Sequence, residues 1–93
     1  MQVYLIVNEE YKYKIGYTDR NIEKRIKELQ TGSHSKMSVV HLYESDNARQ
    51  IETIMHRFNR SKKIIGEWFE FTDAEVANFK PLCEQIDYNI KYL

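Results

Sequence analysis

The stretch QVYLIV at residues 2–7 and the stretch YKYKIGY at residues 11–17 decide how the chain begins to fold. Both are rich in β-branched and aromatic residues, and only three residues separate them, which predicts a β-hairpin. A three-residue loop places Tyr4 opposite Lys14 and gathers the apolar side chains on the other face, whereas a two-residue loop would divide them between the faces. The pattern therefore favours the register in which Tyr4 pairs with Lys14.

A helix is predicted over about residues 20–30, directly after the hairpin. Asp19 can cap its first turn, and Gly32 lies just beyond its end as a stop signal. Apolar residues recur three or four positions apart within it, namely Ile22, Ile26 and Leu29. Arg25 flanks this apolar stripe, so its stem can pack against the sheet while its guanidinium group reaches the sheet edge.

A third strand is predicted at residues 38–43, and a second helix at about residues 46–59. Glu52 and His56 stand together at the border of the apolar stripe of this helix. A solvated helix face can explain this pair. A Glu/His pair at this spacing also suits a transition metal, but one pair without further ligands is weak evidence for zinc.

The carboxy-terminal part begins with a short extended segment at residues 67–71. A Thr-x-x-Glu capping box then starts the last helix at Thr72. Pro81 is expected to kink or break that helix near Lys80, because proline cannot continue a helix interior.

Length and charge limit what the chain can do. Its 93 residues allow one domain, and the balance of 14 basic against 14 acidic residues argues against a strong non-specific binder of nucleic acid. The charges are nevertheless unevenly distributed. Residues 56–66 carry four Lys or Arg and no acidic residue, whereas after residue 66 acidic residues outnumber basic ones by six to two. Runs of like charge usually lie on faces exposed to solvent and have no binding role. Here they would also be explained by one basic and one acidic binding surface.

No stretch is long and apolar enough to cross a bilayer, so no membrane association is expected. The single cysteine, Cys83, cannot form an internal disulfide, and no signal peptide is recognisable at the start of the chain. These features lead us to expect a reducing, cytoplasmic setting.

Several short motifs stand in a characteristic order: Gln2-Val3-Tyr4, Lys14-Ile15-Gly16, Arg25 in the first helix, Glu52 in the second and Gly66-Glu67-Trp68-Phe69. Their order and spacing over about residues 3–71 resemble the GIY-YIG nucleases, and within them a small phage-type branch in which the second motif begins with lysine. Gln2 and Lys14 stand where this family usually has glycine and tyrosine.

The resemblance implies a single GIY-YIG-like domain over residues 1–93, α+β and layered, with a small, mainly antiparallel three-stranded sheet flanked by helices. It also implies a phage or mobile-element endonuclease that hydrolyses DNA with one Mg²⁺ or Mn²⁺ ion, alone or with a protein partner that supplies specificity. Tyr4 would orient or deprotonate the attacking water, Arg25 would bind the scissile phosphate and Glu52 would hold the metal. Lys14 would act as base or as charge stabiliser. The residues expected to contact the substrate are Tyr17, His56, Arg57, Arg60 and Lys62.

A non-catalytic nucleic-acid-binding module with the same fold is the alternative. It would keep a phosphate cradle made of Arg25, Lys14, Arg57 and Arg60. Glu52 favours the enzyme, because a lone carboxylate in a basic cleft repels phosphate unless a cation intervenes. An interaction protein comes third, and would be favoured by an apolar cleft. The oligomeric state, the pathway and the preferred nucleic acid stay open.

Overall fold

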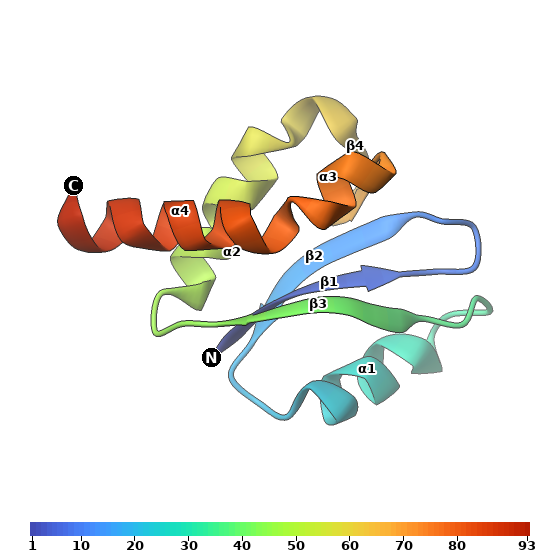
Figure 1. The fold of residues 1–93 in the computed structure, drawn as a ribbon. Helices are drawn as coiled ribbons and strands as arrows, with labels where there is room; N and C mark the ends of the chain where they lie inside the picture. Colours follow the sequence, from blue (N-terminus) through green and yellow to red (C-terminus); the bar gives the residue numbers. More distant parts are fainter.

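A five-stranded antiparallel sheet lies between helices in the computed structural model, which describes residues 1–93 (Figure 1). The strands lie in the order β3-β1-β2-β5-β4 and are β1 (Gln2–Val7), β2 (Tyr13–Thr18), β3 (Ser38–Glu44), β4 (Lys63–Ile65) and β5 (Trp68–Phe69). The helices are α1 (Ile22–Thr31), α2 (Ala48–Phe58), the 3₁₀ turn η1 (Arg60–Lys62), α3 (Asp73–Ala77) and α4 (Phe79–Tyr92). Helix α1 covers one face of the sheet, and α2, α3 and α4 lie over the other.

The α+β class and the helices on both faces agree with expectation, but the prediction of three strands was wrong. Strand β4 has three residues and β5 has two, and together they form a hairpin that extends the sheet beyond β2. A segment as short as β4 shows no repeated alternation of apolar and polar residues, so periodicity could not reveal it.

The amino-terminal hairpin forms, but its register differs from the predicted one. Tyr4 pairs with Gly16, and Lys14 pairs with Ile6, because the loop has five residues instead of three. The Asn8 side chain accepts hydrogen bonds from the amides of Glu10 and Lys12, and Tyr11 adopts a left-handed conformation, φ 59°. Since the shift is two residues, Tyr4 and Lys14 still point to the same face.

The central strand β1 is buried on both faces. Val3 and Leu5 belong to the main core, which they form with residues of β2, β5, α2 and α4. Tyr4 and Ile6 point to the α1 side and are likewise fully buried. Residues of β1 are therefore fixed by packing from both layers, and Tyr4 is a rigid part of the site described below.

The helix ends differ slightly from the predicted ones. Asn21, not Asp19, caps α1, since its side chain accepts from the Glu23 amide at 2.8 Å. Gly32 ends α1, and the capping box at the start of α3 is confirmed. The expected break near Lys80 occurs at Asn78, which leaves Pro81 in the first turn of α4, where a missing amide hydrogen costs little.

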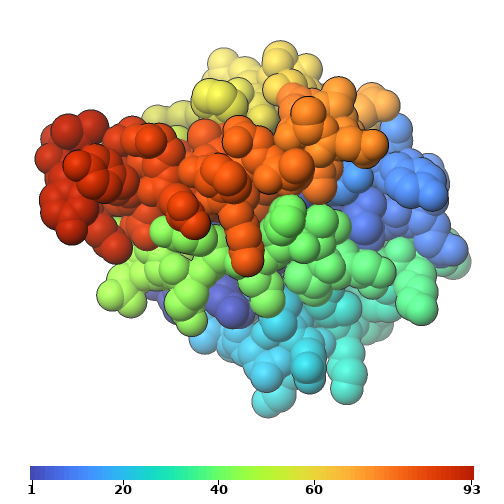
Figure 2. All heavy atoms as spheres, viewed as in Figure 1, coloured from blue at the N-terminus to red at the C-terminus, as the bar shows by residue number.

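The surface shows α4 lying across the front of the molecule, with its carboxy-terminal end projecting to one side (Figure 2). None of the helices combines the length and the apolar composition that crossing a membrane requires.

Candidate functional site

The second half of β2 has an open edge. Strand β5 pairs only with Tyr13 and Lys14, and next to them the Ile15 amide donates to the Glu67 carbonyl oxygen at 3.4 Å, so the pairing on this side ends before Gly16. Helix α2 reaches this edge, where His56 Nε2 lies 3.0 Å from the carbonyl oxygen of Ile15. Side chains from the α1 layer and from the α2 layer can therefore meet around the edge of β2.

A pocket of about 270 Å³ lies at this edge. Its lining residues come from β1, β2, the following loop, α1, α2 and the β4–β5 turn: Tyr4, Gly16, Tyr17, Thr18, Asp19, Arg20, Arg25, Glu52 and Glu67. Most of them are polar or charged, so the pocket suits a small charged group better than an apolar one.

Tyr4 and Gly16 both line this pocket, and the Tyr4 side chain packs directly against Gly16. A Cβ atom at Gly16 would overlap the Tyr4 hydroxyl group, so the ring lies where only glycine leaves room. Burial raises the pKa of Tyr4, and the hydrogen bond from Arg25 Nε, 3.5 Å from the hydroxyl oxygen, only partly opposes this rise. Tyr4 is therefore protonated at neutral pH.

The basic wall of the pocket is made of Arg20 and Arg25. Both guanidinium groups contact the carboxylate of Glu28: Arg20 Nη1 lies 2.8 Å from Oε1, and Arg25 Nη1 lies 3.3 Å from Oε2. Glu28, which does not itself line the pocket, thus holds the position between the two guanidinium groups that a bidentate anion would take.

The acidic wall is made of Glu52 and Glu67, with His56 beside them. One oxygen of each glutamate and one ring nitrogen of His56 lie within 4.8 Å of one another. Lys14 Nζ lies 2.7 Å from Glu67 Oε2 and 5.5 Å from the centre of the Trp68 ring. Burial raises the pKa of Glu52, an effect that His56 opposes and the nearby Glu67 reinforces.

His56 has one ring nitrogen available as a metal ligand. If Nε2 donates its hydrogen to the Ile15 carbonyl, Nδ1 carries the free lone pair that a metal ligand needs. The two carboxylates and this imidazole form a donor set that fits a divalent cation.

Four residues expected at the site from sequence lie in the pocket: Tyr4, Tyr17, Arg25 and Glu52. Lys14 and His56 touch its acidic wall from outside. Arg57 and Arg60 are exposed elsewhere on the surface and do not line the pocket.

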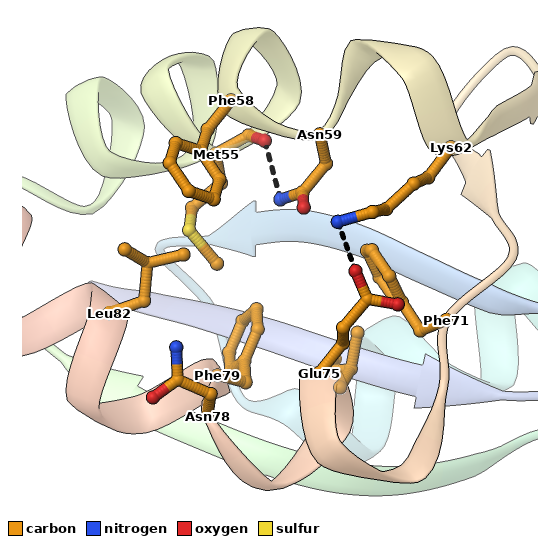
Figure 3. Close-up of a pocket in the computed structure, with 10 residues that line it drawn as sticks. Met55, Phe58, Asn59, Lys62, Phe71, Glu75, Asn78, Phe79 and Leu82 are labelled. Atoms are coloured by element: carbon orange, nitrogen blue, oxygen red, sulfur yellow. Dashed lines mark hydrogen bonds and ion pairs between the residues drawn. The ribbon is translucent and has the colours of Figure 1, made fainter.

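Lys62 lies in a different place. It forms an ion pair with Glu75 at the mouth of a second pocket, about 230 Å³, between α2, α3 and α4 (Figure 3). Phenylalanine side chains line this second pocket, with Asn59 held by a hydrogen bond to the Met55 carbonyl. The predicted cradle of cations is therefore divided between separate surfaces.

Three charged residues of the pocket were missed as site residues from the sequence: Asp19, Arg20 and Glu67. Asp19 was read only as a helix cap, and Arg20 stands in the short loop between β2 and α1. Glu67 follows Gly66, whose φ of 56° marks a tight turn, and it stands in the Gly66-Glu67-Trp68-Phe69 motif, which was the signal in the sequence that could have pointed to it.

Comparison with known proteins identifies the family. The model of the T5orf172 domain matches residues 1–84. KilA-N domain-containing protein 315L of Invertebrate iridescent virus 6, a name that is itself provisional, is 36% identical over 83 residues. This match covers 82% of the present chain but only 35% of the viral protein, so the relative's name describes a much longer protein. No solved structure matches the chain.

These matches correct the family and the activity expected from the motifs. The matching model is not that of the GIY-YIG nucleases, and the viral relative is not named as a nuclease. The expectation of an endonuclease rested on that resemblance, so it was wrong together with it. Motifs of two or three residues recur in unrelated sequences, which is why their spacing misled. The chain belongs to the T5orf172 domain family.

Proposed function

We propose that this chain is a non-catalytic nucleic-acid-binding module that holds a backbone phosphate in the pocket beside β2. The observation that carries the proposal is the convergence of Arg20 and Arg25 on the Glu28 carboxylate. A backbone phosphate offers guanidinium groups the same paired oxygens and the same single negative charge as a carboxylate, so it can take the place of Glu28. The matches to a T5orf172 domain and to a viral KilA-N protein also favour nucleic-acid binding.

Lys14 offsets the charge of Glu67, but Glu52 forms no ion pair, so its carboxylate would repel a phosphate unless a further cation offsets it. We propose that Glu52, His56 and Glu67 hold one divalent ion. Two carboxylates and an imidazole favour Mn²⁺ over Mg²⁺, which prefers oxygen ligands alone. Bound there, the ion would supply the positive charge that makes the acidic wall compatible with a phosphate.

The test is fluorescence anisotropy with a labelled DNA duplex in the presence of Mn²⁺. Arg25→Ala should lower the affinity about tenfold, because it removes the fork that points into the pocket. Lys80→Gln removes an equivalent charge on α4, where Lys80 is exposed, and should bind as the unchanged protein does. Equal affinities for Arg25→Ala and Lys80→Gln would contradict a phosphate site at Arg25.

Glu28→Gln provides a second test with the opposite sign. It removes the carboxylate that competes for both guanidinium groups, so the affinity for DNA should rise about threefold. Unchanged or weaker binding would mean that Glu28 positions the arginines and does not compete with the ligand.

The metal is tested without nucleic acid. Titration of Mn²⁺ followed by electron paramagnetic resonance should show one bound ion, which Glu52→Gln and His56→Ala should both weaken by about tenfold or more. Mn²⁺ affinity that neither substitution lowers would exclude this site. In the DNA mixtures the labelled strand should stay intact on a denaturing gel, and shortened strands would contradict a binding module.

A further inference from the structure

A second surface carries the chemistry of a DNA contact, and the proposed pocket makes no use of it. It comprises the end of α2, the η1 turn and the edge strand β4. We call this surface the basic arm, and its residues are Arg57, Phe58, Arg60, Lys63, Ile64 and Ile65. The corresponding part of the chain, coloured yellow, forms the upper rim of the molecule in Figure 2.

The apolar side chains of the basic arm are exposed to solvent. The exposed fraction is 64% for Phe58, 48% for Ile64 and 74% for Ile65. Ile65 lies at the tip of the β4–β5 hairpin, directly before the Gly66 turn. Ile64 and Ile65 therefore contribute little to the core, and neighbouring exposed apolar side chains of this kind are typical of interaction sites.

The charges of the arm indicate which partner. Arg57, Arg60 and Lys63 are exposed, and none of them forms an ion pair. No acidic residue occurs between Arg57 and Gly66 in the sequence. Three uncompensated cations along one segment complement a row of phosphates, and a surface with two aliphatic residues at its tip is too small for stable membrane binding.

The basic arm also lies next to the proposed phosphate pocket along the chain. Gly66 links the hairpin tip directly to Glu67, which lines that pocket. Nucleic acid held by Arg25 at the edge of β2 would therefore pass close to the tip.

We propose that the basic arm is a second contact with duplex DNA: its cations bind backbone phosphates, and Ile64 and Ile65 enter the minor groove and part a base step. Apolar side chains flanked by cations are the usual means by which proteins open such a step. The inference rests on the proposed function, since the phosphate pocket fixes where the duplex lies.

The experiment uses a short duplex with 2-aminopurine near its centre, whose fluorescence rises when the base is unstacked. The unchanged protein should raise the fluorescence on binding. Ile65→Ser should abolish that rise and weaken binding about fivefold, and Lys63→Gln should weaken binding about threefold. Val39→Ser, an exposed apolar residue on the opposite edge strand β3, and Lys80→Gln are the matched controls and should behave as the unchanged protein.

The outcomes separate this inference from the proposed function. If Ile65→Ser and Lys63→Gln bind and unstack DNA normally while Arg25→Ala fails, the arm is not a contact but the pocket stands. If Arg25→Ala also binds normally, the proposed function fails too. Binding to phosphatidylserine and phosphatidylcholine vesicles that needs Ile65, with DNA binding unaffected, would assign the arm to membranes and overturn the inference.

Discussion

Gly16 is the residue on which the position of Tyr4 depends. A methyl group at Gly16 would overlap the Tyr4 ring, which is fully buried and cannot move without disturbing β1. We expect Gly16→Ala to lower the free energy of unfolding by about 1–3 kcal/mol, as overpacking does in other cores. DNA binding should weaken as well, because the displaced hydroxyl would leave Arg25.

Urea denaturation followed by circular dichroism measures the first effect. Gly32→Ala is the control, since a Cβ atom there meets nothing within 4 Å, and we expect it to change stability by less than about 0.5 kcal/mol. Similar losses in both variants would show that Gly16 matters for its backbone and not for the space it leaves.

Besides its apolar contacts with the core, helix α4 is joined to β3 and to the start of α2 by the carboxylate of Asp87. Asp87 accepts hydrogen bonds from the Tyr43 hydroxyl of β3 at 2.8 Å and from Asn47 Nδ2, before α2, at 3.1 Å. Burial opposes ionisation of Asp87, but hydrogen bonds from Asn47, Tyr43 and Ser45 outweigh it and hold the pKa of Asp87 below its ordinary 3.8. Burial and the bond to Asp87 raise the pKa of Tyr43 to about 12.

A carboxyl group with a lowered pKa stabilises the fold above its ordinary pKa and loses this contribution as the pH falls through the folded-state value. Asp87→Asn should therefore lower the free energy of unfolding by about 1–3 kcal/mol near neutral pH. The difference from the unchanged protein should shrink below pH 3.8. Urea denaturation at both pH values tests this, with the exposed Glu84→Gln on the same helix as control. A difference that persists in acid would contradict the role of the charge.

At the level of secondary structure, the site depends on the short length of β5. Because β5 has only two residues, it leaves the end of β2 uncovered, and His56 of α2 takes up the Ile15 carbonyl instead of a strand amide. A longer β5 would close the edge of the sheet and separate the Arg25 side from the Glu52 side.

The net charge of the whole molecule is zero, so its affinity for DNA must come from local cations and not from an overall attraction. Arg20, Arg25 and the cations of the basic arm suggest about four or five phosphate contacts. The logarithm of the binding constant should then fall with the logarithm of salt concentration with a slope of roughly −4. Arg25→Ala and Lys63→Gln should each reduce the slope by about 1. Anisotropy titrations over a range of KCl concentrations measure it, and a slope that neither change affects would place the contacts elsewhere.

The sequence by itself determined the local structure of this protein. The alternation of side chains along the two strands predicted that Tyr4 and Lys14 share one face of the sheet. This prediction held although the predicted register was wrong, because a shift by an even number of residues keeps a side chain on the same face. Gly32 ends α1, and Thr72 with Glu75 caps α3, since glycine stops and capping boxes act within a few residues.

Only the tertiary structure decided the sheet, the pocket and the separation of the cations. Strands β4 and β5 are too short to form alone and exist because β2 offers an edge. Glu67 reaches Glu52 and His56 through contacts between residues that are distant in sequence. The ion pair of Lys62 with Glu75, on another surface, likewise depends on how η1 and α3 pack together. Backbone preferences act over a few residues, whereas the meeting of charged side chains depends on how whole layers pack.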